Sequence, residues 1–331
     1  MKTKPLPDPD TLILDELARN FSTDDAARDY LESVRWPDGV VCPHCKPSDD
    51  KPKDSICRIS ANPEKKVRAG LYCCLKCKKQ FTVTVGTIFE DSHIPLRKWL
   101  IAWYLMASSK KGVNALQLQR QLWGQKPDGK LNGSYKTAWF MMHRIRYALQ
   151  ESDAGEKLSG IVEADEAFIG GEAVGKGRGH RRNKTAILTI VERGGRARSQ
   201  VLERVTSSTL KAAVRENVLI CSKLMTDQHP GYTGLAPKYD HETVKHSAKE
   251  FIRGDVHVNT AESCFSLLKR SVVGTFHSVS KKYLPLYLAE FDHRWNHRKD
   301  TDGARTFAAL RKAEGKRMTY KPMKQKEGTS E

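Results

Sequence analysis

Three acidic residues, Asp165, Asp227 and Glu262, stand in sequence contexts that could bring their carboxylates together. Each aspartate lies in or ends a short apolar run of the kind that forms a β-strand, and Glu262 lies in a segment with helical periodicity. Carboxylate oxygens are preferred ligands of hard divalent cations such as Mg2+ or Mn2+. Such a trio predicts a site for two ions about 4 Å apart, which is typical of enzymes that break and form phosphodiester bonds.

The charge of the chain points to a nucleic-acid partner. Of 331 residues, 57 are Lys or Arg and 39 are Asp or Glu, so the formal net charge is +18. A polyanion such as double-stranded DNA is the natural counterpart of that excess. The apolar runs are shorter than the roughly 18 residues of a membrane-spanning helix, and the polar start lacks the apolar core of a signal peptide. We therefore expect a cytoplasmic protein.

Two cysteine pairs predict one structural zinc site. Cys42 and Cys45 form one C-x-x-C pair, and Cys74 and Cys77 form a second. Two such pairs suit a single tetrahedral Zn2+, and metal binding folds a segment that is too small to be stabilised by burial alone. His44 lies inside the first pair, where we expect it to face solvent and not to replace a cysteine.

The residues around these pairs complete a predicted zinc ribbon over 37–92. The basic segment between the pairs is longer than a compact ribbon needs, so we expect it to loop out. The alternating segment Gln80–Phe89 predicts a closing hairpin, and Cys57 and Cys73 are left without a ligand role. A purely structural zinc module that binds another protein is the alternative.

Four segments before residue 152 have the periodicity of helices. The first, in the N-terminal segment 1–36, should pack on the zinc module. The other three suit a helix-turn-helix region over 93–152, in which Lys136 and Arg144 would contact DNA. An ordinary helical bundle with a solvated basic face is the alternative. The predicted helices are Thr23–Arg35, Leu96–Ser108, Asn114–Leu122 and Ser134–Leu149.

The block from 155 to 310 has the strand and helix pattern of an α/β domain, and the tail 311–331 has the composition of a disordered segment. Three strands in hairpin succession precede a helix and a short buried strand that ends at Asp227. A strand reached through a helix runs parallel to its neighbour. We therefore expect a mixed sheet in the order of a ribonuclease-H-like fold. The expected strands are Ile161–Phe168, Thr185–Val191, Ser199–Val205, Lys223–Thr226 and His241–His246, and the expected helices begin at Ser207 or Ser208 and at Asn259.

Alternation along the first strand limits the choice of its metal ligand. Glu163 and Asp165 share one face, whereas Glu166 is on the other and should not join the same site. In the helix that follows, an apolar stripe places Glu262 and Lys269 together on the opposite side. A lysine two turns beyond an acidic ligand lies about 10 Å along the same face, where it can hold a phosphate. A solvated polar face is the alternative.

Basic side chains that could contact DNA phosphates occur in three further groups. One is a glycine-rich loop after the first acidic strand, the second follows Glu262, and the third lies on the last amphipathic helix. Each cation could instead be a solvated charge. The candidates are Arg178, Arg181, Arg182 and Lys184 in the loop, Lys269 and Arg270 after Glu262, and Arg298 on the last helix.

Several of these segments resemble those of a known family. They are similar to bacterial insertion-sequence transposases of the ISXO-like group, and the similarity extends from about Phe21 to Leu310. The resemblance implies a zinc ribbon and a helix-turn-helix followed by a DDE-type catalytic domain of ribonuclease-H-like fold. The segments are Val162–Gly171, Thr226–Asp227, His257–Glu262 with Leu267–Arg270, and Glu290–Arg298.

The resemblance also implies roles for individual residues. Asp165, Asp227 and Glu262 would be the metal-binding acids, and Lys269 the basic residue that follows them. Asn259 is the rival for the third position, because some members carry asparagine there; we favour Glu262, since a carboxylate binds a hard cation better than an amide does. Water would first free a 3′-hydroxyl at the transposon end, and that hydroxyl would then attack target DNA. Joining two ends makes a homo-oligomer on DNA the expected assembly.

Two other classes of function fit parts of the pattern. A domesticated DNA-binding regulator would keep the zinc ribbon and helix-turn-helix without needing all three acids. A ribonuclease-H-like nuclease would cut DNA without joining it. The three acids together argue against the regulator, and two modules suited to recognising specific DNA ends argue against the nuclease.

Overall fold

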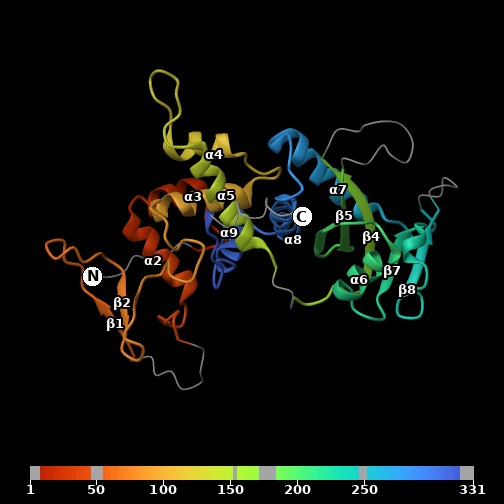
Figure 1. Ribbon diagram of the computed structural model, residues 1–331, viewed down its shortest axis with the longest axis horizontal. Helices are drawn as coiled ribbons and strands as arrows, with labels where there is room; N and C mark the ends of the chain where they lie inside the picture. The colour runs from red at the N-terminus through yellow and green to blue at the C-terminus, as the bar shows by residue number, and fades with distance from the viewer. Residues whose placement is uncertain (1–7, 46–54, 152–154, 171–183, 246–251, 321–331) are drawn as a thin grey trace, which may run out of the picture. The chain divides into compact units, whose positions relative to one another are not determined.

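The computed structural model describes residues 8–45, 55–151, 155–170, 184–245 and 252–320. The chain divides into two compact units, whose helices and strands are labelled in Figure 1. The first unit comprises Met1–Ser109, Ala115–Leu149 and Asp300–Glu331, and the second comprises Lys110–Asn114 and Gln150–Lys299. The tail from residue 321 onward lies outside the described residues.

The zinc-ribbon segment forms a three-stranded antiparallel sheet. Strand β1 (Ile56–Ile59) pairs with β2 (Leu71–Cys74), which pairs with β3 (Gln80–Phe81). Because β1 lies between the two cysteine pairs, the expectation that this segment loops out is wrong for residues 56–59.

The predicted hairpin over Gln80–Phe89 is also wrong, since β3 ends at Phe81. The following residues form successive turns, closed by backbone hydrogen bonds such as that from Val85 N to Thr82 O at 3.1 Å. Gly86 adopts a φ of +76°, which an extended strand does not use. The apolar alternation reflects burial of these turns against the unit and not a strand.

Helix α2 (Asp24–Arg35) packs against the ribbon sheet, as expected. The Tyr72 hydroxyl of β2 donates a hydrogen bond to Glu32 of α2 at 2.7 Å. The ring of Trp36, which follows α2, meets the rings of Tyr72 and Phe81 edge to face at 5.7 and 6.0 Å. Aromatic contacts of this kind extend the small core of the ribbon into the helical part of the unit.

Three helices follow the ribbon within one residue of their predicted positions. They are α3 (Leu96–Ser108), α4 (Ala115–Trp123) and α5 (Tyr135–Leu149). Trp99 and Trp103 of α3 are almost completely buried, so this helix forms the centre of the bundle.

Two further helices complete the first unit. The short helix α1 (Leu14–Asn20), which was not predicted from the sequence, precedes α2. Helix α9 (Asp302–Arg311) packs against α3, and Arg305 Nη1 donates to Ala107 O at 3.3 Å. The expected catalytic block included most of α9, whereas in the structure this helix groups with the first unit.

The second unit is built on a five-stranded mixed sheet of order β6-β5-β4-β7-β8. β4 pairs antiparallel to β5 and parallel to β7, while β5 and β6 are antiparallel and β7 and β8 are parallel. The predicted meander, followed by a helix and a parallel strand, is confirmed. The strands are β4 (Ile161–Ile169), β5 (Thr185–Glu192), β6 (Ala197–Leu202), β7 (Lys223–Asp227) and β8 (Asp240–Val244).

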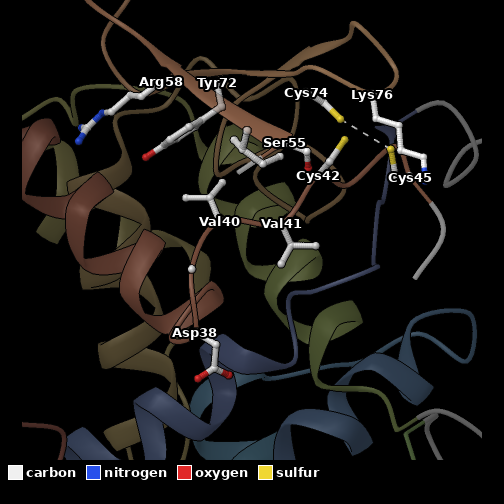
Figure 2. A pocket seen from close by; sticks show the side chains of 12 residues that line it. Asp38, Val40, Val41, Cys42, Cys45, Ser55, Arg58, Tyr72, Cys74 and Lys76 are labelled. Atoms are coloured by element: carbon white, nitrogen blue, oxygen red, sulfur yellow. Dashed lines mark hydrogen bonds between the residues drawn. The ribbon is translucent and has the colours of Figure 1, made fainter. Parts of the chain in front are cut away.

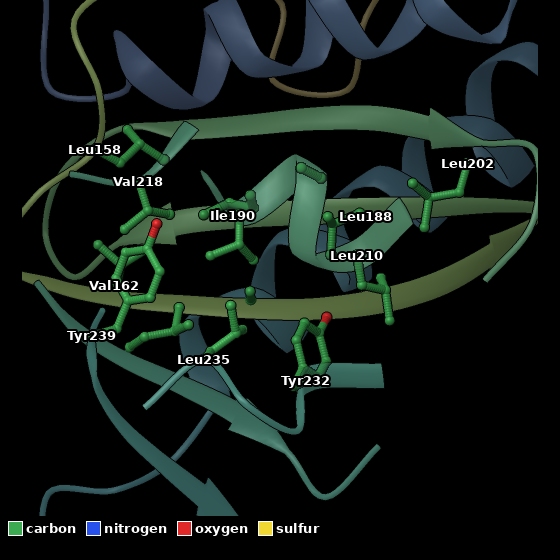
Figure 3. Close-up of a cluster of buried hydrophobic side chains, with 14 of the residues drawn as sticks. Leu158, Val162, Leu188, Ile190, Leu202, Leu210, Val218, Tyr232, Leu235 and Tyr239 are labelled. Carbon is green, nitrogen blue, oxygen red and sulfur yellow. The ribbon is translucent and has the colours of Figure 1, made fainter. Parts of the chain in front are cut away.

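Helices cover both faces of this sheet. α6 (Ser207–Asn217) covers one face, where its Leu210 packs in the same buried cluster as Leu188 of β5 (Figure 3). α7 (Asn259–Ser271) and α8 (Leu284–Asn296) cover the other face and share a second buried cluster with β4 and β5. The two clusters hold the sheet between apolar layers, which fixes the ends of its strands.

The ends of two helices differ from the sequence-based expectation. α6 is capped by Thr206 and not by Ser207 or Ser208, because the Thr206 side chain accepts a hydrogen bond from Thr209 N. α7 runs on into a π-helical turn, Val272–Phe276. No helix in the described ranges is long and apolar enough to cross a membrane.

Candidate metal centres and nucleic-acid interface

Four cysteine sulfurs meet at one end of the ribbon sheet. The Sγ atoms of Cys42, Cys45, Cys74 and Cys77 all lie within 4.8 Å of one another. Two of the sulfur pairs, Cys42 with Cys77 and Cys45 with Cys74, are 3.7 and 3.8 Å apart. A tetrahedral ion with Zn–S bonds of about 2.3 Å requires sulfurs about 3.8 Å apart. The spacing therefore fits the single structural Zn2+ predicted from the two cysteine pairs.

Backbone groups of the second pair favour the thiolate form that zinc binds. The pKa of Cys74 is lowered to about 6, first by the backbone N–H of Cys77, with burial opposing the shift and the N–H of Lys76 assisting it. His44 is not part of the cluster, and its ring lies 6.4 Å from that of Phe81.

A cavity of about 430 Å³ lies beside the cysteines, within the first unit (Figure 2). Val40, Val41 and Tyr72 give it an apolar lining, and Arg58 and Lys76 bring two cations to it. This cavity belongs to the ribbon and contains none of the acidic residues predicted to bind divalent ions.

Asp165 lies in the middle of β4, and Asp227 is the last residue of the neighbouring parallel strand β7. β4 and β7 pair with Ala164 opposite Thr226, so each aspartate is the next residue along its strand. Strand alternation places both side chains on the face that α7 covers. The structure therefore brings together the first two acids of the predicted trio.

Local backbone bonds orient both aspartates. Asp165 Oδ1 accepts a hydrogen bond from Glu166 N at 2.8 Å, and Asp227 Oδ1 accepts one from His229 N at 2.9 Å. Bonds of this kind fix the carboxylate rotamer. Two oriented carboxyl groups therefore lie side by side on one face of the sheet.

Glu163, two residues before Asp165, is fully buried and holds the N-terminus of α7. Its Oε2 accepts hydrogen bonds from Thr260 N at 2.7 Å and Ala261 N at 3.1 Å. Its Oε1 accepts one from Thr260 Oγ1 at 3.0 Å. The carboxylate therefore satisfies the first-turn N–H groups of α7 and lies at the positive end of the helix dipole.

Two further side chains complete the pocket around Glu163. Arg193 Nε donates to its Oε1 at 2.6 Å, and His257 Nδ1 lies 3.3 Å from the same oxygen. Arg193 also donates to the carbonyl of His257 at 3.0 Å. With both oxygens engaged in this way, Glu163 caps the N-terminus of α7. Asp165 stays the predicted metal ligand of this strand.

Glu262 and Asn259 both lie in the first turn of α7, on its exposed side. Because Glu163 ties this turn to β4, Glu262 is carried on a helix anchored to the strand of Asp165. Lys269 is exposed further along the helix. The predicted apolar stripe is confirmed, with Ala261, Cys264, Phe265, Leu268 and Val272 all buried.

The ligand atoms of the three predicted acids do not form a cluster in the described residues. In the described part of the chain, the four cysteines are the only group of three or more Cys, His, Asp or Glu residues whose ligand atoms lie within 4.8 Å of one another. Glu262 must therefore turn its exposed side chain toward Asp165 and Asp227 to share an ion with them.

Glu166 interacts electrostatically with the two aspartates, which strand alternation did not predict. It is on the other face of β4, yet its pKa is raised to about 8, first by burial and then by the charges of Asp227 and Asp165. β7 ends at Asp227, so no strand lies beside this part of β4 on that side. That Glu166 does not join the same metal site stays a prediction.

The candidate DNA contacts in the helical region differ in exposure. Lys136 is exposed at the start of α5. Arg144 is buried, where its guanidinium donates to Glu90 O at 2.7 Å and lies 5.3 Å from the ring of Trp99. Burial lowers the pKa of Arg144 to about 10. This placement favours a structural role for Arg144 over a surface contact.

The candidate DNA contacts of the second unit also differ in how far their side chains are exposed. Lys269 and Arg270 are exposed, and Lys184 is half-buried just before β5. Arg298 ties α8 to the β5–β6 turn, since its Nη1 donates to Gly195 O and Trp295 O, both at 2.9 Å. The remaining three candidates, Arg178, Arg181 and Arg182, lie outside the described residues.

Two family models match the parts of the chain that contain these centres. Residues 157–296 match the ISXO2-like transposase domain, and residues 22–80 match the transposase zinc-ribbon domain. The resemblance to ISXO-like transposases is confirmed. The matched transposase domain contains Asp165, Asp227 and Glu262, and the matched zinc ribbon contains all four clustered cysteines.

A relative from an insertion element is similar over most of the chain. An uncharacterized protein in transposable element ISH50 of Halobacterium salinarum is 28% identical over 295 residues. The aligned part covers 83% of this chain and 92% of that protein. The similarity therefore extends well beyond either matched domain, and together with the two domains it supports a transposase.

Proposed function

We propose that the chain is a DNA transposase that cleaves transposon ends and joins the freed 3′-hydroxyl to target DNA. The observation that carries the proposal is the placement of Asp165 and Asp227 on adjacent parallel strands, beside the helix that carries Glu262. The strand order and the mixed parallel pairing of the sheet support a ribonuclease-H-like fold. Helices α3, α4 and α5 are the proposed helix-turn-helix region.

Asp165, Asp227 and Glu262 are the residues that would hold Mg2+ or Mn2+. The donor set fits, because hard cations prefer carboxylate oxygens. The pKa of Glu166 is raised first by burial, and the charges of Asp227 and Asp165 add to that shift. When bound, two such ions would favour ionisation of the attacking water or hydroxyl and offset the charge of the leaving oxygen.

The chain's own side chains would position the DNA strand. Lys269 is exposed two turns beyond Glu262, about 10 Å along α7, where its ammonium group can hold a phosphate beside the reacting one. Asn259, in the same exposed turn as Glu262, is the alternative third ligand.

Direct transfer between DNA oxygens requires no protein nucleophile. Cys264 is the cysteine nearest in sequence to Glu262, and it is fully buried with a pKa raised by that burial. A neutral buried thiol is a poor nucleophile. The second unit therefore fits a mechanism in which water and then a DNA hydroxyl attack phosphorus.

The test uses the full chain, labelled DNA from the terminal inverted repeat that flanks the gene, a target plasmid and Mg2+. The intact protein should release a labelled 3′ end and join it to the plasmid. Asp165→Asn, Asp227→Asn and Glu262→Gln should each lower both products by more than about 100-fold, since even residues that only support metal ligands are worth 10- to 100-fold.

Asp240→Asn is the matched control. Asp240 is an exposed carboxylate at the first residue of β8, at the opposite end of the parallel strands. Its substitution should leave cleavage and joining unchanged. If the intact protein cuts but never joins, it is a nuclease; if it binds the ends without cutting, it is a regulator.

The same assay decides the third ligand. Glu262→Gln should abolish joining, while Asn259→Ala should retain most of it. Retained joining by Glu262→Gln with loss in Asn259→Ala would transfer the role to Asn259. A transposase that joins two ends together should also form a dimer or larger assembly on end DNA, which light scattering of the complex measures.

A further inference from the structure

The turn that follows α7 presents an apolar side chain to solvent. Val273 lies in the π-helical turn Val272–Phe276 and is 72% exposed, more than any other large apolar side chain in the described ranges. The neighbouring Gly274 has no heavy atom within 4 Å of the position that a Cβ would occupy. Val273 and Gly274 therefore form a projecting tip.

The residues on both sides of this tip are anchored in the second unit. Val272 is buried in the cluster beneath α7, and Val279 packs against the same cluster. The ring of Phe276 lies 4.8 Å from that of Tyr287 in α8. Phe276 also fits so closely over Gly112 that a Cβ there would lie 2.7 Å from its Cζ. The tip is consequently held in a fixed position.

The backbone beside the tip is strained. His277 has a φ of +61° and a ψ of −48°, and Ser278 N donates to Phe276 O at 2.7 Å. This is a γ-turn with positive φ, which is rare and costly for a residue other than glycine. Single π-helical turns and strained residues each occur frequently at functional sites.

The stretch of sequence that contains the tip carries only positive charge. No Asp or Glu occurs in the sequence between Glu262 and Glu290. The exposed cations in this interval are Lys269, Arg270, Lys281 and Lys282. An apolar tip flanked by cations on both sides complements a nucleic acid, whose phosphates enclose apolar base stacks.

We propose that Val273 is a wedge that inserts between base pairs of the DNA bound by the transposase domain, while the flanking cations hold the phosphates. This inference rests on the proposed function and adds how the DNA beside the cut is distorted. At about 1.5 Å per residue along α7, Val273 lies about 16 Å from Glu262. That distance corresponds to about five base pairs of B-form DNA.

The first measurement is fluorescence of 2-aminopurine, which rises when the base is unstacked. The probe is a duplex of the flanking terminal inverted repeat with 2-aminopurine about five base pairs from the cleavage site. All proteins carry Asp165→Asn so that the duplex stays intact. Binding should raise the fluorescence several-fold, and adding Val273→Ala should remove the rise, because alanine is too short to separate the bases.

The second measurement is affinity as a function of salt. Val273→Ala should weaken binding about tenfold, as expected for the removal of two methylene equivalents of apolar surface, without changing the salt dependence. Lys281→Gln should instead lower the slope of log affinity against log salt by about 0.9 for each phosphate that is no longer neutralised. If Val273 were merely solvated, Val273→Ala would change neither the fluorescence nor the affinity.

Ile220→Ala is the matched control for loss of an exposed aliphatic side chain. Ile220 is 58% exposed and precedes β7, at the edge of the sheet opposite Asp227. Its substitution should leave fluorescence and affinity unchanged. Thermal unfolding should show Val273→Ala to be folded like the parent, as expected at an exposed site.

Two results would overturn the wedge. One is a parent protein that binds the duplex without any rise in fluorescence; the other is a Val273→Ala protein that equals its parent in both measurements. Cleavage and joining by protein with an intact Asp165 test the proposed function separately. If the Val273→Ala protein cleaves and joins DNA normally, the proposed function stands and the wedge proposal is refuted.

Discussion

The buried carboxylate of Glu163 offers a direct test of how the acidic edge of the sheet is assembled. Its two oxygens accept hydrogen bonds from Thr260, Ala261 and Arg193. Glu163→Gln keeps the size of the side chain but replaces one acceptor oxygen with a donor NH2 group. The new NH2 group would lie opposite N–H donors, from which it cannot accept a hydrogen bond. The guanidinium of Arg193 would also lose the negative charge with which it pairs.

The expected loss in the free energy of unfolding follows from how deeply the ion pair of Glu163 and Arg193 is buried. Glu163 is 0% exposed and the Arg193 side chain is 20% exposed. Removing one partner of a buried ion pair costs roughly 3 to 5 kcal/mol, and the partial exposure of Arg193 favours the lower end of that range. Loss of the negative charge at the start of α7 adds up to about 1 kcal/mol. We expect the free energy of unfolding of the second unit to fall by roughly 3 to 4 kcal/mol.

The assay must report on the second unit alone, because the chain has two units and need not unfold in one step. Hydrogen exchange of peptides from α7, measured at increasing urea, meets that need. The slowest amides of α7 should lose protection corresponding to roughly 3 to 4 kcal/mol in Glu163→Gln. Arg193→Met should cost a similar amount, since it leaves Glu163 charged and unpaired.

The double variant separates this explanation from simple loss of packing. Glu163→Gln with Arg193→Met removes both charges, so its loss should be smaller than the sum of the two single losses by at least about 1 kcal/mol. A Glu163→Gln protein within about 1 kcal/mol of the parent, or strictly additive losses, would refute the reasoning.

Three further predictions follow from the other centres. The pKa of Glu166 is raised from 4.5 to about 8 in the folded state. Without divalent cations, the folded protein between these two pH values therefore holds a proton that the unfolded chain has lost, and the free energy of unfolding should fall as pH rises from about 4.5 to about 8. Glu166→Gln should remove that fall in thermal unfolding measured from about pH 5 to about pH 9, and parallel profiles for the two proteins would contradict the assignment. Cys74→Ser should lower the zinc content from about one ion per chain to nearly none by elemental analysis, while Cys57→Ser keeps its zinc. Arg144→Met should lower the free energy of unfolding by roughly 2 kcal/mol with little change in the salt dependence of DNA binding, whereas Lys136→Met should show the reverse; equal effects of the two on DNA binding would restore Arg144 as a surface contact.

Local sequence pattern was enough to predict the elements that carry the acids. The apolar runs that contain Asp165 and precede Asp227 are clearly patterned, so β4 and β7 lie close to their predicted positions. The stripe on α7 likewise fixed which side of the helix is buried. The zinc cluster followed from cysteine spacing alone, because its chemistry requires little else.

Contacts between elements distant in sequence were not predictable in this way. Glu163 and Asp165 share a face and are both acidic, and only the position of α7 shows that Glu163 accepts hydrogen bonds from the N–H groups of that helix. Arg144 looked like a surface cation, yet its long side chain lies against Trp99. The proximity of Glu166 to the aspartates depends on where β7 stops, which alternation along β4 does not encode.

The way the chain returns to its first unit has a consequence for synthesis on the ribosome. The polypeptide leaves the zinc-ribbon unit after α5 and comes back only with α9, which packs on α3. The whole five-stranded sheet is therefore translated before the first unit can be completed. A premature stop shortly after α8 would leave a complete sheet joined to a first unit that lacks α9, so nonsense mutations there should impair the folding of the first unit more than the folding of the second.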